Sequence, residues 1–323
     1  ENRAERPQEF ARCEVSRDST DCPFCAGHES ETPTAIDLSK DLAGASGTDW
    51  QLRVVPNKYP AVGLPTLEDE VGEYCPLYAS GDGLGQRQPG FGVHEVIIES
   101  PHHLVSFSEL TEPQAELVFL AYRHRLLALQ SKAQVEYALI FKNARADAGA
   151  SIEHVHSQLI ALPWIPHEIQ YELTKAHEHL LMCGDSLMES VLAAEVADGR
   201  RIVTSTDRFT VFCPAASRLP YETWVVPRHA APRFELESPE VIAEAAQLVR
   251  DVIIRLERVI DQPAYNFWLH SAPLRDDSGR IHWRIEIASR LTRLAGFEIG
   301  TGCFINSVAP EEAAVCLRQE TSE

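Results

Sequence analysis

The stretch that decides the fold and the site is "GASIEHVHSQLIALP", Gly149 to Pro163. It places His154, His156 and Gln158 at every second position, ahead of an apolar run. In a β-strand, side chains at i, i+2 and i+4 share one face, so we expect a strand with these three groups on one side. Burying a row of polar side chains is costly, and the pattern therefore indicates a functional site.

The composition is that of an acidic globular protein. The chain has 323 residues, of which 44% are hydrophobic and 24% charged, and its net charge is −19. This charge gives nucleic-acid binding no electrostatic support, although a small anionic ligand needs only a local positive pocket. No apolar run approaches the ~20 residues of a membrane span, and the first residues lack a signal-like apolar core. We expect neither a nucleic acid nor a membrane as partner.

The cysteine pattern predicts a metal site. Eight cysteines are spread along the chain, which favours reduced thiols and a cytoplasmic protein. Cys22 and Cys25 form a Cys-x-x-Cys pair, a common half of a tetrahedral zinc site. No second such pair follows, so the other ligands should be histidines, His154 and His103, with His102 as the rival of His103. Four protein ligands make a structural site. A redox disulfide and plain reduced cysteines are the alternatives.

A metal bound to His154 would hold His156 rigidly beside it, free to face a substrate. The alternative is that His156 is a hydrogen-bonded core histidine. Its alternation with Gln158, and the Gly149–Ser151 loop before it, favour the functional interpretation.

The second half of the chain repeats the order of the first: strand, Pro-x-His, loop, long helix, then two strands. The clearest helix is predicted over 111–132, with Thr111 as N-cap and Pro113 in the first turn. We predict an α+β fold of two related halves, residues 1–165 with the chemistry and 166–323 in support; chance similarity is the alternative. The repeat aligns Pro101, His103, His154, His156 and Gln158 with Pro227, His229, His282, Arg284 and Glu286.

Taken together, the ordered motifs resemble the galactose-1-phosphate uridylyltransferase family of the histidine-triad superfamily. They are "CPFC" with a following glycine, "PNKYPAV", "ESPHH", "FKN" with "GAS" and "HVHSQ", "HWRIEI" and "GFEIGTGCFIN", spanning about residues 20 to 315. "GFGVHEVIIESP" and "GFEIGTGC" resemble most the ADP-glucose phosphorylase branch. The resemblance implies a duplicated half-barrel of antiparallel sheet and helices, a homodimer, and ping-pong transfer of a nucleoside monophosphate through a covalent histidine.

The resemblance also implies roles for individual residues. Cys22, Cys25, His103 and His154 match the zinc ligands, His156 the nucleophile, and Gln158 the glutamine that hydrogen-bonds the phosphate on that histidine. Contacts with the nucleotide and its phosphates fall on Asn57, Asn143, Gly149 and Ser151. Sugar-side contacts, which in some members come from the partner subunit, fall on Glu298 and Asn306.

Some members of the family hold a second metal in the other half. The matching region here, "LMCGDSLM", has no Cys-x-x-Cys, so we expect one zinc site and no complete second one. The candidates that remain are Glu172, His229, His270 and His282. Arg284 at the position of the nucleophile makes the second half structural.

The reaction implied is transfer from a nucleotide sugar, UDP-glucose or ADP-glucose, to a sugar phosphate or inorganic phosphate. Gln158 donates a hydrogen bond without offering a general acid, which favours transfer over hydrolysis. A uridylyltransferase is the first interpretation, and an ADP-glucose phosphorylase and a histidine-triad hydrolase are the alternatives. A zinc-stabilised nucleotide-binding scaffold is a further alternative, but it leaves His156 and Gln158 without a role.

Overall fold

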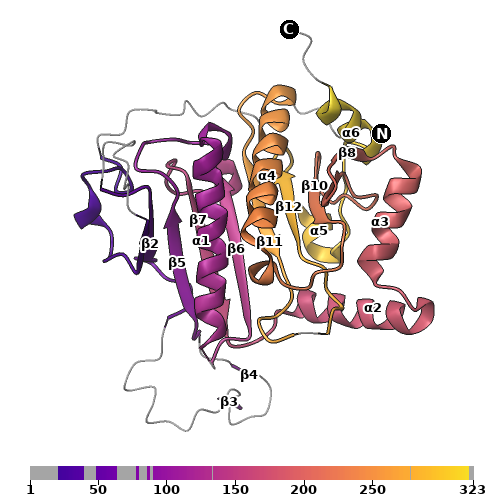
Figure 1. Ribbon diagram of the computed structural model, residues 1–323, viewed down its shortest axis with the longest axis horizontal. Helices are drawn as coiled ribbons and strands as arrows, with labels where there is room; N and C mark the ends of the chain where they lie inside the picture. The colour runs from indigo at the N-terminus through magenta and orange to yellow at the C-terminus, as the bar shows by residue number, and fades with distance from the viewer. Residues whose placement is uncertain are drawn as a thin grey trace.

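A computed structural model describes residues 21–39, 49–63, 78–79, 86–87, 90–132, 134–276 and 278–319. Within these residues, most strands belong to one large sheet (Figure 1). Its strands are β1 (Asp37–Ser39), β2 (Leu52–Pro56), β5 (Val93–Ile98), β6 (Tyr137–Ala144), β7 (His156–Leu162), β8 (Ile202–Ser205), β9 (Phe209–Phe212), β10 (Thr223–Pro227), β11 (Tyr265–His270) and β12 (Arg284–Ser289). The short β3 (Tyr78–Ala79) and β4 (Gln86–Arg87) pair separately.

The strand order of this sheet is β1-β2-β5-β7-β6-β11-β12-β10-β9-β8, and every neighbouring pair is antiparallel. The order reads alike from both edges, because β6 and β11 meet at the centre, flanked by β7 and β12 and then by β5 and β10. At the centre, Asn143 pairs with Asn266. The boundary predicted at residue 165 falls just after β7, and the sheet runs across it without interruption.

Two long helices cover one face of the sheet. The helix α1 (Glu112–Gln130) lies against the first half and α4 (Pro239–Val259) against the second, and the two pack on each other (Figure 1). The main core forms between these helices and the sheet, and includes the fully buried Phe119 and Tyr122 of α1. Each such side chain contributes ~1.5–3 kcal/mol by leaving water.

Both helices begin at a hydroxyl side chain that caps the first turn. Thr111 accepts a hydrogen bond from the Gln114 N–H and Ser238 one from the Val241 N–H, and each N-cap is followed by a proline in the first turn. The helix predicted over 111–132 is thus confirmed, although α1 ends two residues earlier, at Gln130.

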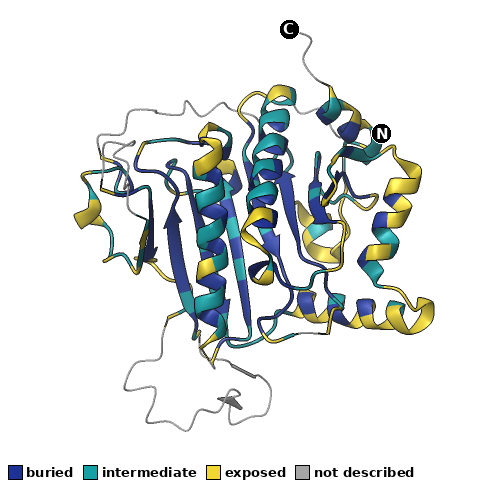
Figure 2. Ribbon diagram, viewed as in Figure 1, coloured by how far each residue is buried: buried dark blue, intermediate teal, exposed yellow. Residues whose placement is uncertain are grey.

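The other face of the sheet is covered at its two ends. On one side, residues 22–35 pack over β2 and β5 through Cys22 and Phe24, and Trp50, just before β2, joins the same cluster. On the other side, α2 (His167–Cys183) and α3 (Leu187–Asp198) place Ile169, Leu173, Met188 and Leu192 against the second half. Figure 2 shows the strands buried and the outer faces of α2 and α3 exposed.

Two short α-helices, α5 (Gly296–Thr301) and α6 (Pro310–Arg318), lie near the C-terminal end of the described residues. Four 3-10 helices of one turn each complete the described elements: η1 (Glu29–Glu31), η2 (Phe107–Glu109), η3 (Ala146–Ala148) and η4 (Phe234–Leu236). None of the helices in the described ranges combines the length and apolar character that crossing a bilayer would require. The predicted α+β class, an antiparallel sheet with helices, is confirmed.

Candidate functional site

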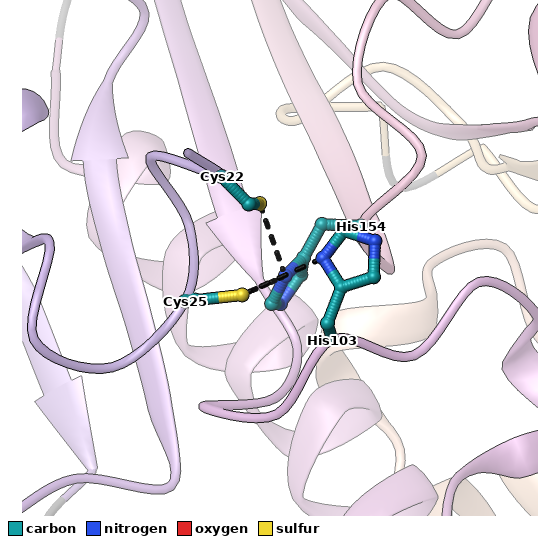
Figure 3. Close-up of side chains that lie close together, drawn as sticks. All are labelled: Cys22, Cys25, His103 and His154. Atoms are coloured by element: carbon teal, nitrogen blue, oxygen red, sulfur yellow. Dashed lines mark hydrogen bonds between the residues drawn. The ribbon is translucent and has the colours of Figure 1, made fainter. Parts of the chain in front are cut away.

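The four predicted metal ligands come together from three separate segments (Figure 3). Cys22 and Cys25 lie on one tight loop, His103 follows β5, and His154 precedes β7. All four ligand atoms lie within 4.8 Å of one another. The His154 Nδ1 atom is 3.5 Å from both sulfurs, and the His103 Nδ1 atom is 3.5 Å from the Cys25 sulfur. His102, the rival of His103, is exposed and outside this cluster.

The donor set fits a tetrahedral zinc ion. Zinc bonds of about 2.0–2.3 Å place tetrahedral ligands about 3.3–3.8 Å apart, which matches the three nitrogen–sulfur distances of 3.5 Å. His154 donates its Nε2–H to the Ser100 carbonyl at 2.8 Å, and burial lowers its pKa to about 3. The ring is therefore neutral and turns a lone pair on Nδ1 toward the two sulfurs. A carbonyl that fixes the tautomer of a histidine in this way is typical of metal sites.

The protonation state of the thiols depends on whether a metal ion is bound. Burial and the neighbouring Cys22 raise the pKa of Cys25 to about 12, so the protein alone would keep this thiol protonated at neutral pH. A bound zinc ion reverses that preference, because a coordinating thiol is deprotonated.

His154 does not lie in the predicted strand, and this expectation was wrong. The strand β7 begins only at His156. Before it, the Val155 N–H donates to the Leu104 carbonyl and the Val155 carbonyl accepts from the Glu99 N–H. The chain there follows the segment after β5, which brings His154 beside His103, with the two rings edge to face at 5.4 Å.

His156 is held in the tautomer that a nucleophile needs. Its Nδ1–H donates to the His154 carbonyl at 2.6 Å, which leaves the lone pair on Nε2. Burial, with a contribution from the Lys142 charge, lowers the pKa of His156 to about 4, so the ring is neutral at pH 7. Phe24, from the loop of Cys22 and Cys25, contacts the His156 ring edge to face at 5.2 Å. The loop that carries the two predicted cysteine ligands thus contacts the predicted nucleophile.

His94 orients Gln158, and the sequence analysis missed it. The Ala61 N–H donates to His94 Nδ1 at 3.0 Å, so the ring hydrogen lies on Nε2, which faces the Gln158 Oε1 atom at 2.9 Å. With its oxygen engaged, Gln158 keeps its NH₂ group for a ligand. In the sequence, His94 stands two residues before Val96 and therefore on the same face of β5. Val96 pairs with Gln158 of β7, so this spacing was the signal that His94 and Gln158 share one face. The side-chain amide of Asn57 lies beside this pair, 3.1 Å from His94 Nε2.

The second half supports Asn143 across the centre of the sheet. Asn266 donates from Nδ2 to the Asn143 Oδ1 atom and to the Ala148 carbonyl, both at 2.8 Å. The amide nitrogen of Asn143 then points toward the loop, 3.5 Å from the Gly149 carbonyl. Gly149 has a φ of 93°, which suits glycine, and Ser151 beyond it is exposed.

A buried polar layer lies behind His156, on the face covered by α1. The Lys142 ammonium donates to Glu99 Oε2 at 2.6 Å and to the His156 carbonyl at 2.9 Å. The other Glu99 oxygen accepts from Tyr122 at 3.1 Å and from Ser157. Lys142 and Glu99 are 1% and 0% exposed. The backbone of the predicted nucleophile is therefore fixed from behind by an ion pair.

The predicted sugar-side residues, Glu298 and Asn306, lie in and after α5 and make contacts of their own. Glu298 accepts from the Ala295 N–H at the start of α5, and Asn306 donates to the Ser217 carbonyl. Within the described ranges, no hydrogen bond or ion pair joins either side chain to His156.

In the second half, Arg284 stands at the position aligned with His156, and its side chain is engaged in ion pairs. Arg284 contacts Glu172 at 3.0 Å and Glu286 at 2.7 Å, and His270 lies 3.1 Å from Glu172. Among the described residues, the cluster of Cys22 is the one group that matches a metal-ligand set. His282 is buried separately, and burial lowers its pKa to about 4.

Comparison with known proteins places this geometry in a family. ADP-glucose phosphorylase of Arabidopsis thaliana is 28% identical over 323 residues, covering 98% of this chain and 88% of the relative. Galactose-1-phosphate uridylyltransferase of Thermotoga maritima is 27% identical, covering 96% and 92%. A crystal structure of an Arabidopsis thaliana ADP-glucose phosphorylase with bound ADP-glucose superposes with a TM-score of 0.80 at 27% identity, covering 96% of this chain and 92% of that one.

A uridylyltransferase structure at 23% identity shares the fold, with a TM-score of 0.77 over 95% of this chain and 93% of that one. Residues 86–320 match the model described as "Domain of unknown function (DUF4921)". The chain therefore belongs to the DUF4921 family, among the galactose-1-phosphate uridylyltransferase-like proteins.

Proposed function

We propose that this chain is a nucleotidyltransferase that moves a nucleoside monophosphate from a nucleotide sugar to a phosphate acceptor through His156. The observation that carries the proposal is the bond from His156 Nδ1–H to the His154 carbonyl. This bond leaves the lone pair of the neutral ring on Nε2. The ring is held by the His154 carbonyl and by contact with Phe24.

In the first step, Nε2 attacks the α-phosphorus of the nucleotide sugar, and the bond to the sugar phosphate breaks. The sugar phosphate leaves with the bonding electrons. In the second step, an oxygen of the acceptor phosphate attacks the same phosphorus, the N–P bond breaks, and His156 returns to the neutral form. Such a covalent route divides one difficult displacement into two easier ones.

The groups around His156 stabilise the charges that develop during the reaction and position the nucleotide. Because the Gln158 oxygen faces His94, its NH₂ group is free to donate to a phosphoryl oxygen, as does a preorganised donor in an oxyanion-type site. The His154 carbonyl stabilises the positive charge that the His156 ring gains when Nε2 is phosphorylated. Asn143, Gly149, Ser151 and Asn57 frame the nucleotide side.

Zinc, held by Cys22, Cys25, His103 and His154, would act as a structural ion that fastens the loop of Cys22 and the residues before β7. Its four protein ligands leave no position for water. The reduced cysteines that this site needs also favour a cytoplasmic location.

A mass measurement tests the proposal. The protein is mixed with UDP-glucose or ADP-glucose without acceptor, and its intact mass is recorded under conditions that preserve phosphohistidine. We expect an increase of one UMP or one AMP, absent in His156→Gly and kept in His102→Ala, which changes an exposed histidine outside the cluster. Absence of an adduct with both donors would contradict the proposal, and release of free nucleotide without acceptor would instead indicate the hydrolase.

The donor follows from which adduct forms. A UMP adduct indicates a hexose-1-phosphate uridylyltransferase. An AMP adduct indicates an ADP-glucose phosphorylase with inorganic phosphate as acceptor. The Arabidopsis relative, which spans 98% of this chain, favours this second candidate.

We also infer a homodimer. The segment 294–305 exposes large apolar side chains, a pattern typical of interaction surfaces, and it carries Glu298, a predicted sugar-side residue. The side chains are Leu294, Phe297, Ile299, Phe304 and Ile305. Light scattering after size exclusion should give twice the chain mass, and Phe297→Glu with Ile299→Glu should give a monomer that still binds zinc. A monomeric parent protein would contradict the inference.

A further inference from the structure

Arg145, at the start of the loop between β6 and β7, has a backbone conformation that belongs to glycine. Its φ is 69° and its ψ 163°. Residues with a side chain rarely occupy this region, and doing so is energetically costly. Glycine would adopt the same backbone without strain. The sequence therefore has an arginine at a position where its backbone conformation favours glycine.

Among the described residues, no hydrogen bond or ion pair engages the guanidinium group of Arg145. The side chain is half-buried, and its Nη1 atom is buried without a hydrogen bond. None of the ion pairs found among the described residues includes it. Arg125 and Arg284, by contrast, each make short contacts with a buried or half-buried carboxylate, Glu95 and Glu172. An unpaired buried donor is unfavourable, so this arginine carries a second cost.

The backbone of Arg145 organises the loop that frames the predicted nucleotide site. Its carbonyl accepts from the Ala148 N–H at 3.2 Å and from the Ala150 N–H at 3.1 Å. Asn143 precedes it by two residues and Gly149 follows by four. Arg145 thus places a cation beside the residues predicted to contact the nucleotide, in a protein whose net charge is −19. Lys142, the neighbouring cation, lies on the opposite face and is already paired with Glu99.

We propose that Arg145 is a phosphate-binding residue that takes the phosphate not carried by His156, on the departing sugar phosphate or on the acceptor. The proposal rests on the function proposed above. A guanidinium group binds phosphate oxygens through two parallel hydrogen bonds, and the ligand thus satisfies the nitrogen that the protein leaves unpaired.

Inorganic pyrophosphate is the probe, because it offers two phosphates without base or sugar and requires no reaction. Calorimetry compares its affinity for the parent protein, Arg145→Gly, and the matched control Arg293→Ala, which removes an exposed arginine that contacts Asp147 of the same loop. We expect Arg145→Gly to weaken binding about 10- to 100-fold while it raises the unfolding temperature, since the strain is gone. The control should bind as the parent does.

Equal affinity of the parent protein and Arg145→Gly for pyrophosphate would overturn the proposal, and so would failure of the parent to bind it. Arg145→Lys keeps the charge but loses the planar fork, and we expect an intermediate affinity. The His156 adduct is measured on the same samples. Pyrophosphate binding that depends on Arg145, without any adduct in the parent protein, would refute the nucleotidyl transfer and leave the phosphate site standing.

Discussion

Glu99 and Lys142 should contribute to the free energy of unfolding mainly as a pair, so that removing one charge costs more than that charge contributes by itself. The charged atoms of the pair are 2.6 Å apart, and both side chains are essentially removed from water. In Lys142→Met, the Glu99 carboxylate would keep only the hydroxyls of Tyr122 and Ser157. Removing one partner of such a pair costs about 3–5 kcal/mol, a large part of the ~5–15 kcal/mol that holds a typical protein folded.

The double variant Lys142→Met/Glu99→Gln contains neither charge, and its amide oxygen still accepts from Ser157. We therefore expect its cost to be smaller than the sum of the two single costs by about 1–3 kcal/mol. Guanidinium unfolding of the four proteins at pH 7, followed by circular dichroism, measures these differences. Lys175→Met, which removes an exposed lysine paired with Glu178, is the control and should unfold as the parent does.

Additive costs, within about 0.5 kcal/mol, would refute the reasoning, because the two side chains would then not stabilise each other. The pair also has a consequence for the site. Since Lys142 donates to the His156 carbonyl, the single variant should lower the rate at which the His156 adduct forms. The Lys175 control should not change this rate.

Three other perturbations have defined outcomes. Cys22→Ser should lower the zinc content measured by mass spectrometry from about one ion per chain toward none, whereas Cys183→Ser, an exposed thiol outside the cluster, should keep it; full zinc in both variants would contradict the site. The close contact with His270 and the Arg284 charge hold the pKa of Glu172 well below its usual range despite its burial, so its contribution to stability is complete above an ordinary carboxyl pKa and is lost as the pH falls. The stability lost in Glu172→Gln, measured by denaturant unfolding, should therefore shrink between about pH 6 and about pH 3; a constant difference would argue against the assignment. A Cβ atom at Gly92 would lie 2.2 Å from the Ala161 carbonyl oxygen, whereas one at Gly90 would lie 3.9 Å from its nearest neighbour, so Gly92→Ala should lower the unfolding temperature and Gly90→Ala should not.

The sequence predicted the ligand cluster because Cys-x-x-Cys and the paired histidines have few other uses at that spacing. It also predicted α1, whose N-cap and first-turn proline are local signals. It could not place His154 correctly, because the start of β7 depends on the bond from Val155 to Leu104, a residue about fifty positions earlier. A periodicity argument considers only the local chain and extends a strand as far as the alternation lasts.

The polar layer behind His156 was missed for a related reason. Glu99 and Lys142 look like ordinary charged residues in apolar strands, and their pairing depends on which strands become neighbours. His94 is similar, because its role depends on the β5–β7 register that pairs Val96 with Gln158. The helices α2 and α3 gave no motif, and their function is to cover the second half. The two-half organisation and the individual site roles stay predictions.

The central pairing of β6 with β11 affects how the protein can be made. Asn143 and Asn266 are 123 residues apart in the chain, so at ~5–20 residues per second a ribosome needs about 6–25 seconds to supply the second after the first. During that interval β6 is the open edge of a half-formed sheet, and open edges invite pairing with other chains. A charge that points inward from an edge strand discourages such pairing, and Lys142 lies on that strand. We expect the same lysine that fixes the His156 backbone in the finished protein to discourage pairing of this edge with other chains during synthesis.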